Sequence, residues 1–217
     1  MSTPTPAAAA PSSADAGAPL PPVVTLFEQF GAGATYVGQK VAEALGVPFH
    51  GQAFSSEAIE SGGRSSDDDE VLIRVFAVMG GSYLGLDGRE VANTQRQKYE
   101  LVVGNNRHIH ELAANGGVIM GRNATVILAE RPSTVHVLLT GKVEDRIARA
   151  ARDAGITPER AAERQRREDE IRAEMSLTLY GWDPREADRY DLVLNTSRID
   201  LDRAVDAILA AVAASTH

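Results

Sequence analysis

The chain of 217 residues contains no cysteine, so disulfides, thiolate-bound zinc, iron–sulfur clusters and cysteine nucleophiles are excluded. It has no run approaching the ~18 uncharged apolar residues that a membrane-spanning helix needs, and we therefore expect a soluble, cytoplasmic protein without a membrane partner. Basic residues are outnumbered, 22 against 30 acidic ones, which gives a net charge of −8. That balance disfavours broad nucleic-acid binding but leaves room for a local basic patch that holds a phosphorylated ligand.

Aromatic residues are absent from the first 22 positions, which hold six of the ten prolines and seven alanines. Such a Pro/Ala-rich segment buries too little apolar surface to offset its ordering entropy, so we predict that residues 1–22 form a disordered tail. The segment also lacks the basic start and continuous apolar stretch of a secretion signal. Residues 23–217 have ordinary globular composition and are long enough to bury a large core as one domain.

Short apolar runs alternate with helix-like segments along this domain. The expected strands are 23–27, 47–49, 118–120, 135–139 and 191–194. The expected helices are 35–45, 71–79, about 90–114 with an interruption at Gly104, 143–154, one that begins at Thr157-Pro158 and one that Asp200 caps. This order predicts an α/β fold, in which a five-stranded parallel sheet carries helices on both faces. Ligands of such sheets bind beyond the carboxyl ends of the strands.

The sequence Gly31-Ala32-Gly33 lies between the first strand and the first helix. Backbone N–H groups of such a turn converge on an anion, and the helix N-terminus adds positive potential. A tight turn without a ligand explains the same residues equally well, because a single Gly-x-Gly pair is weak evidence. The complete dinucleotide-binding and Walker A patterns are both absent, since Tyr36 and Gln39 stand at their required Gly and Lys positions.

Four stretches together resemble the cytidylate-kinase-like branch of the P-loop nucleoside monophosphate kinases, whereas residues 50–110 match poorly. The stretches are Phe30 to Gly33 with the helix that ends before Phe49, Val118 to Ala124, Asp169 to Arg172 followed by Tyr180-Gly181-Trp182, and Tyr190 to Ser197. The resemblance implies a P-loop kinase fold with an arginine-rich helical lid. It also implies ATP-dependent phosphorylation of a CMP-like nucleoside monophosphate, with Mg²⁺ between the ATP phosphates.

The same resemblance implies the site residues. Nucleotide binding falls to Gly31, Ala32, Gly33, Ala34, Thr35, Arg122 and Asn123. The catalytic positions of the lid are Arg166, Asp169 and Arg172, and no residue is expected to bind a metal directly. Arginine suits this chemistry because phosphoryl transfer needs fixed positive charge around the phosphate oxygens.

The chain departs from the family pattern at the loop. Ala34 stands where a functional kinase has its lysine, and Tyr36 stands where it has the Mg²⁺-binding hydroxyl, with Thr35 one position earlier. The divergent branch often replaces the lysine with an Arg-Glu pair before the glycines, but here Phe27 to Phe30 contains no arginine. The alternative function is therefore a catalytically inactive pseudokinase that senses a nucleotide or binds a protein partner, including a second copy of itself.

The arginine-rich segment 142–172 also has two interpretations. It holds nine basic residues against eight acids, which is typical of a solvated helix pair with many ion pairs as well as of a lid that binds phosphate. Elsewhere, His108 and His110 are two positions apart on a predicted helix and do not share a face, so a metal site there is not expected.

Overall fold

The computed structural model of the chain describes residues 20–52 and 88–215, and residues 88–95 by their backbone alone. The tail up to residue 19 and the helix predicted over 71–79 lie outside the described residues. Every other predicted strand and helix can be compared with the structure.

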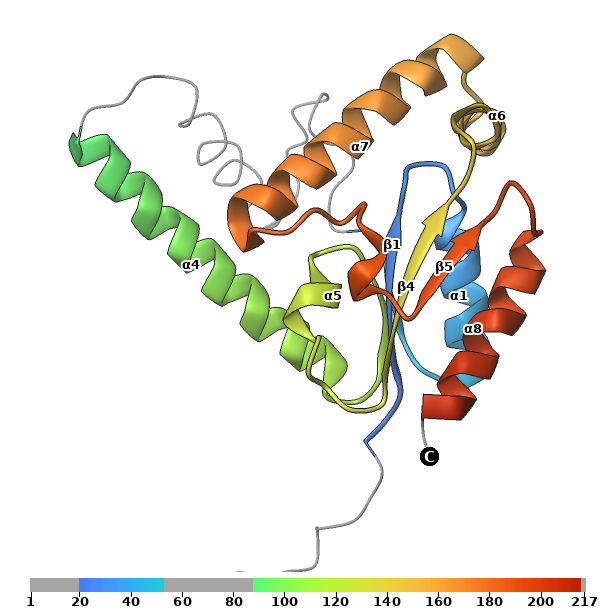
Figure 1. Cartoon of the computed structure of the whole chain (residues 1–217), viewed down its shortest axis with the longest axis horizontal. Coiled ribbons are helices and arrows are strands. Elements are labelled where there is room, and N and C mark those ends of the chain that lie inside the picture. Colours follow the sequence, from blue (N-terminus) through green and yellow to red (C-terminus); the bar gives the residue numbers. More distant parts are fainter. Residues whose placement is uncertain (1–19, 53–87, 216–217) are drawn as a thin grey trace, which may run out of the picture.

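Five parallel strands form one sheet, as the sequence predicted (Figure 1). They are β1 (Val23–Glu28), β2 (Phe49–His50), β3 (Gly117–Met120), β4 (Thr134–Thr140) and β5 (Leu192–Asn195). Their spatial order is β2-β3-β1-β4-β5, so the first strand lies at the centre. Its neighbours are β3, with Val23 opposite Gly117, and β4, with Val23 opposite Thr134.

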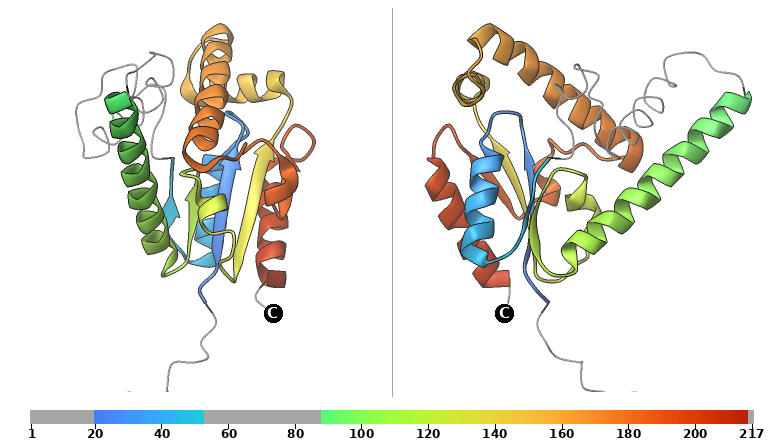
Figure 2. Two further views of the ribbon diagram at one scale, coloured as in Figure 1. Left: turned by 60° about the vertical axis from the view of Figure 1, so that its left-hand side comes forward. Right: turned by 180° about the vertical axis from the view of Figure 1, so that it is seen from behind.

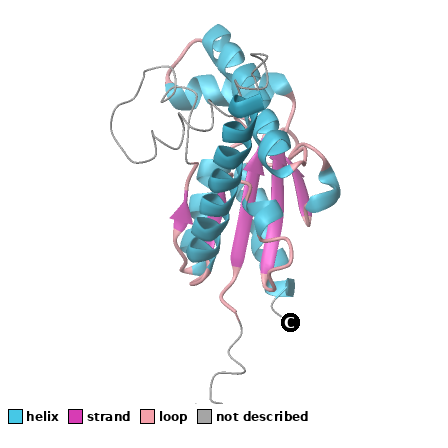
Figure 3. Ribbon diagram, turned by 90° about the vertical axis from the view of Figure 1, so that its left-hand side faces the viewer, coloured by secondary structure: helices cyan, strands magenta, loops and turns pink. Residues whose placement is uncertain are grey.

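Helices cover both faces and the carboxyl edge of this sheet (Figures 1 and 2). One face carries α1 (Ala34–Leu45) and α8 (Leu201–Ser215), and the other carries α4 (Gly88–Ala113) and α5 (Ala124–Ile127). Seen from its own side of the molecule, α4 lies in front of the sheet (Figure 3). The helices α6 (Val143–Ala154) and α7 (Pro158–Tyr180) lie beyond the carboxyl ends of the strands, and a short 3-10 helix, η1 (Ala187–Arg189), precedes β5.

The helix ends follow the capping signals of the sequence. The Thr157 hydroxyl accepts a 3.3 Å hydrogen bond from the Arg160 N–H, directly before Pro158 begins α7. The Asp200 carboxylate accepts a 2.8 Å bond from the Arg203 N–H at the start of α8. At the C-terminal end of α1, Gly46 has φ +67°, a left-handed conformation that favours glycine.

The core is built from small and branched aliphatic side chains, as expected of a chain with few aromatic residues. Val37 and Val41 of α1 pack with Ile208 and Val212 of α8 on one face of the sheet, and all four are buried. Fully burying a side chain of this size stabilises a fold by roughly 1.5–3 kcal/mol. These contacts hold the start of α1 rigidly beneath the loop that follows β1.

One prediction needs correction. The helix α4 runs through Gly104 without the predicted interruption, because a single glycine costs a helix interior only about 1 kcal/mol. Two residues before Val23 contact the domain: the Pro21 carbonyl accepts a 2.9 Å bond from Arg131, and the Pro22 carbonyl accepts a 3.1 Å bond from the Gly117 N–H. Within the described residues, no helix combines the length and apolarity needed to cross a bilayer.

Candidate functional site

The site lies at the carboxyl edge of the sheet, where the chain stops adding strands on one side of β1 and begins adding them on the other. The chain leaves β1 toward β2 on one side and later returns to β4 on the other, so the loops after β1, β3 and β4 meet at one edge. Backbone hydrogen bonds join these loops to the strand ends. The Gly121 N–H donates to the Leu26 carbonyl over 2.8 Å, and the Gln29 N–H donates to the Leu139 carbonyl over 3.0 Å.

The glycine loop is shaped by its two left-handed residues. Gly31 has φ +83° and Gly33 has φ +95°, conformations that other residues adopt only with strain. A Cβ atom at Gly31 would also collide with the backbone carbonyl of Arg146 on α6. Glycine is therefore required at residue 31 both for the turn and for the close approach of α6.

The side chain of Glu28 occupies the inside of this loop. Its Oε2 atom accepts a 3.0 Å hydrogen bond from the Ala34 N–H at the start of α1, and the residue is buried. Burial raises the pKa of Glu28, while Arg172 and the N–H groups of Ala34 and Gly33 lower it in part. A carboxyl group thus lies where the backbone N–H groups and the positive end of α1 converge.

Arg172 of α7 lies beside the same carboxylate. Its Nη1 is 3.7 Å from Glu28 Oε1 and donates a 3.4 Å bond to the Glu28 backbone carbonyl. Its Nη2 is 3.0 Å from Glu168 Oε2. Only 11% of the Arg172 side chain is exposed, so these charges interact with little solvent screening.

Asp169 of α7 connects the lid, formed by α6 and α7, to the glycine loop through hydrogen bonds. Its Oδ1 accepts a 2.6 Å bond from the Phe30 N–H. Its Oδ2 accepts from Arg146 over 2.8 Å and from Gln165 over 2.7 Å. Arg146 donates as well to the Phe30 carbonyl over 3.0 Å, so both polar backbone groups of Phe30 are held by the lid.

Two further arginines, Arg164 and Arg149, also contact the loop. The guanidinium carbon of Arg164 lies 5.1 Å from the centre of the Phe30 ring, and that of Arg172 lies 5.7 Å from it. Arg149 donates to the Gly31 carbonyl over 2.7 Å and to the Thr196 carbonyl over 2.9 Å. The inner face of the arginine-rich segment therefore contacts the loop.

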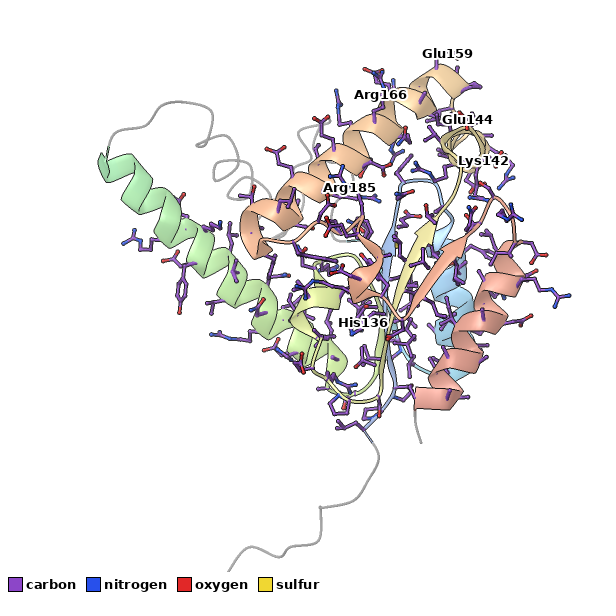
Figure 4. All side chains as sticks on the ribbon, in the orientation of Figure 1. His136, Lys142, Glu144, Glu159, Arg166 and Arg185 are labelled. Carbon is purple, nitrogen blue, oxygen red and sulfur yellow. The ribbon has the colours of Figure 1, made fainter. Side chains whose placement is uncertain are left out.

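The outer face of the arginine-rich segment 142–172 has the solvated ion pairs that its other interpretation predicted. Arg152 and Asp153 form an exposed ion pair of 2.8 Å. Arg166 is exposed and lies on the side of α7 away from the sheet, so the structure does not bring this predicted catalytic residue to the loop (Figure 4). Asp169 and Arg172 do lie at the loop, where they contact Phe30 and Glu28.

The side chains that follow the loop point elsewhere. Thr35 is exposed, and its hydroxyl lies 4.0 Å from the Met120 sulfur. The Tyr36 hydroxyl donates a 2.7 Å bond to Asp202 on α8. Ala34 is fully buried and contributes its N–H group rather than a side-chain charge.

The Gly-Arg turn after β3 forms the second part of the site. Arg122 and Asn123 have φ +57° and +58°, which is uncommon outside glycine and costs conformational energy. The Nε and Nη2 atoms of Arg122 each donate a 3.3 Å bond to the Gly51 carbonyl. Asn123 accepts a 3.1 Å bond from the Trp182 indole, so its side-chain oxygen supports packing against this buried ring.

A histidine lies close to this turn. The Nε2 atom of His50 is buried and has no hydrogen-bond partner among the described residues. Burial, and to a lesser extent the charges of Arg122 and His108, lower its pKa. A half-buried arginine and a neutral imidazole therefore flank the edge of the sheet beside β2 and β3.

The geometry agrees with a comparison of the sequence with known families. A family model described as "Cytidylate kinase-like family" matches residues 23–198, which is most of the chain. The chain belongs to the cytidylate kinase-like family. The glycine loop, the Gly-Arg turn and the lid all fall within the matched residues.

Curated relatives match parts of the chain. A cytidylate kinase from Methanopyrus kandleri is 29% identical over 137 residues, which cover 59% of this chain and 71% of that enzyme. A cytidylate kinase from Ignicoccus hospitalis is 31% identical over 102 residues, which cover 47% of this chain and 59% of that enzyme. A uronate isomerase from Corynebacterium glutamicum is 33% identical over 105 residues. This last match covers 48% of the chain but spans 20% of the isomerase.

Solved structures share the fold. An uncharacterized protein from Eubacterium ventriosum has a TM-score of 0.63 at 17% identity, and the match covers 89% of this chain and 99% of that one. A gluconokinase from Sinorhizobium meliloti has a TM-score of 0.50 at 17% identity, covering 89% and 93% of the two chains. The P-loop kinase fold predicted from the sequence is thus confirmed.

Magnesium with ATP, which the family implies, fits this loop poorly. The Tyr36 hydroxyl is bound to Asp202, and the Thr35 hydroxyl faces a methionine sulfur rather than the loop interior. Neither hydroxyl is therefore directed at a Mg²⁺ ion that would accompany ATP in the loop.

Several residues of the site were missed from the sequence. The role of Phe30 and Arg164 depends on how α7 lies over the loop, which no local pattern reveals. The sequence shows that Glu28 lies beside the loop, and its hydrogen bonds could also have been predicted: an acid at the end of a buried strand needs nearby donors, and the glycine loop supplies them. Helical spacing could likewise have separated Arg166 from Arg172, because six residues at about 100° each place them on different faces.

Proposed function

We propose that this member of the cytidylate kinase-like family binds a nucleoside monophosphate, CMP-like in size and charge, at the carboxyl edge of its sheet. Its nominal reaction is phosphorylation of that nucleotide by ATP, and we expect the transfer to be very slow. The observation that carries the proposal is Arg122 in the Gly-Arg turn, whose Nε and Nη2 atoms both donate to one oxygen at the carboxyl edge of the sheet, over 3.3 Å each. The glycine loop is the second phosphate site, because a backbone N–H group and an arginine there contact a carboxyl group.

The acceptor phosphate is assigned to the Gly-Arg turn. Arg122 is half-buried beside His50, and its donors are directed at a backbone carbonyl that a phosphate oxygen can replace. A phosphate carries a full negative charge and can accept two parallel N–H bonds from an arginine, whereas the carbonyl oxygen is neutral, so the exchange favours the ligand. The names of two relatives, both cytidylate kinases, support a cytidine nucleotide as the first ligand to test.

The expectation of slow transfer rests on the loop side chains. Phosphoryl transfer depends on cations placed around the migrating group, and one such cation contributes ~10³–10⁵ in rate in related enzymes. Ala34 supplies none, and Tyr36 is engaged with Asp202. The arginines at the loop are bound to carboxylates, carbonyl groups or the Phe30 ring; they are Arg146, Arg149, Arg164 and Arg172.

A thermal-shift panel tests nucleotide binding directly. A ligand that binds only the folded state raises the melting temperature, by an amount that grows with its concentration relative to Kd. We expect nucleoside monophosphates to raise it in the wild type and to do so much less in Arg122→Ala. A panel of mono-, di- and triphosphates that leaves the melting temperature unchanged, with and without Mg²⁺, would contradict the proposal.

The second candidate function is that of a pseudokinase, a nucleotide sensor or protein-interaction module located in the cytoplasm. It is favoured by the buried Ala34 at the lysine position. Binding without turnover separates it from a working kinase. Light scattering with and without nucleotide would then show whether the chain forms a homo-oligomer in response.

A further inference from the structure

We propose that Glu28 acts as an internal stand-in for phosphate, so that the glycine loop accepts the phosphates of a nucleoside triphosphate only after this carboxylate leaves. The inference rests on the proposed function in one respect, the identity of the loop as a phosphate site. It adds a regulatory contact: the chain itself closes the donor side of the site at the start of α1.

The position of the carboxylate carries the proposal. Glu28 is the last residue of β1, and its side chain turns back into the loop to reach the Ala34 N–H over 3.0 Å. Ala34 is the first residue of α1, whose unpaired N–H groups and dipole attract anions. A phosphate bound there would need the same N–H group, and it would meet a negative charge already in place.

Residues of α7 contact Glu28 in the way that lid arginines would contact a phosphate. Arg172 approaches Glu28 Oε1 to 3.7 Å and contacts its backbone carbonyl, while its other nitrogen is paired with Glu168. The Phe30 ring lies against both Arg172 and Arg164. The cations that would close over a phosphoryl group are therefore already engaged by carboxylates and an aromatic ring of the same chain.

Part of the Glu28 carboxyl group is weakly held. Its Oε1 atom lies 3.7 Å from Arg172 Nη1, whereas Arg172 Nη2 makes a shorter contact of 3.0 Å with Glu168 Oε2 and would keep it without Glu28. Removing the carboxylate should thus leave the fold intact and expose the N–H groups and Arg172 to an added anion. The gain should be specific to ligands that reach the loop.

Inorganic tripolyphosphate is the probe, because it tests the loop without a nucleobase. Isothermal titration would compare the wild type, Glu28→Ala and the control Glu43→Gln, which removes one carboxylate from an exposed position on α1. We expect Glu28→Ala to bind tripolyphosphate at least tenfold more tightly than the wild type, and Glu43→Gln to match the wild type. Equal affinity of Glu28→Ala and the wild type would overturn the proposal.

Two additions keep the test decisive. Glu28→Gln preserves the shape of the side chain and removes its charge; if Glu28→Ala does not fold, this variant should show a gain of the same sign, and no gain would overturn the proposal. CMP titrated into the same proteins separates the two proposals. Unchanged CMP binding without a tripolyphosphate gain defeats the role of Glu28 alone, whereas absence of CMP binding in the wild type defeats the proposed function.

Discussion

The carboxylate of Asp169 accepts a 2.6 Å hydrogen bond from the backbone N–H of Phe30, a residue 139 positions earlier. Its second oxygen binds Arg146, whose side chain is only 4% exposed. One aspartate therefore joins α6, α7 and the glycine loop. The loop holds its shape because the lid is bound to it, and the two cannot be altered independently.

Replacing Asp169 tests this coupling. Asp169→Ala leaves the buried charge of Arg146 without its carboxylate, and we expect a loss of about 3–5 kcal/mol in the free energy of unfolding, measured by urea denaturation. Asp153→Ala removes an exposed carboxylate from the neighbouring helix and should change stability by less than about 0.5 kcal/mol. Equal losses of unfolding free energy in the two variants would show that the buried contact of Asp169 stabilises the fold no more than an exposed ion pair does.

Two truncations test where the domain begins. Deleting residues 2–19 should leave the melting temperature unchanged, because this Pro/Ala-rich stretch has little apolar surface to bury. Deleting residues 2–22 also removes the carbonyl groups that accept from Arg131 and Gly117, and should lower the melting temperature by several degrees. Identical melting curves for the two truncations would place the boundary after Pro22.

The buried histidines predict a loss of stability on mild acidification. His136 lies within β4, and its Nδ1 is hydrogen-bonded to the Thr25 hydroxyl over 2.8 Å (Figure 4). Burial lowers its pKa, and Asp191 opposes this only in part. Below the unfolded pKa of about 6.5 the unfolded chain therefore binds protons before the folded one, so stability falls as the pH falls. His50 contributes with the same sign.

Urea unfolding between pH 7.5 and pH 5.5 measures this slope. Each histidine accounts for at most about 1.4 kcal/mol per pH unit. His136→Asn should therefore flatten the dependence relative to the wild type, whatever its effect on stability at neutral pH. An unchanged slope would mean that His136 titrates in the folded protein as it does in the unfolded chain.

Arg122 is expected to carry most of the monophosphate affinity. Arg122→Ala should weaken CMP binding by about 1.5–3 kcal/mol, a tenfold to hundredfold rise in Kd, because a charge-assisted bond is lost. Arg152→Ala is the matched control, since it removes an exposed arginine remote from the turn. Calorimetry that finds equal affinity for Arg122→Ala and the wild type would remove Arg122 from the site.

Much of the fold could be predicted from local signals, and the failures have physical causes. Thr157-Pro158 and Gly46 mark helix ends because capping depends on neighbouring residues alone. The continuity of α4 at Gly104 could not be predicted in this way, because the packing of the whole helix outweighs the preference of one residue.

The candidate site was less predictable than the fold. The positions of Gly31, Gly33 and Glu28 at the loop follow from the sequence, because they depend on the backbone and on neighbouring residues. The contacts of Glu28 with Arg172 and of Arg164 with Phe30 do not, since they arise only when α7 lies across the loop. The sequence shows that the loop lacks a lysine, but the structure shows a carboxylate already held inside it.

The formation of CDP by the purified wild-type protein at saturating ATP, CMP and Mg²⁺ near neutral pH tests the central claim most directly. Ala34 supplies no cation, and Glu28 fills the loop, so we predict turnover far below the usual enzyme range of ~1–10³ s⁻¹. A variant that combines Glu28→Ala, Ala34→Lys and Tyr36→Thr should be faster. Wild-type turnover within the usual range would contradict the account.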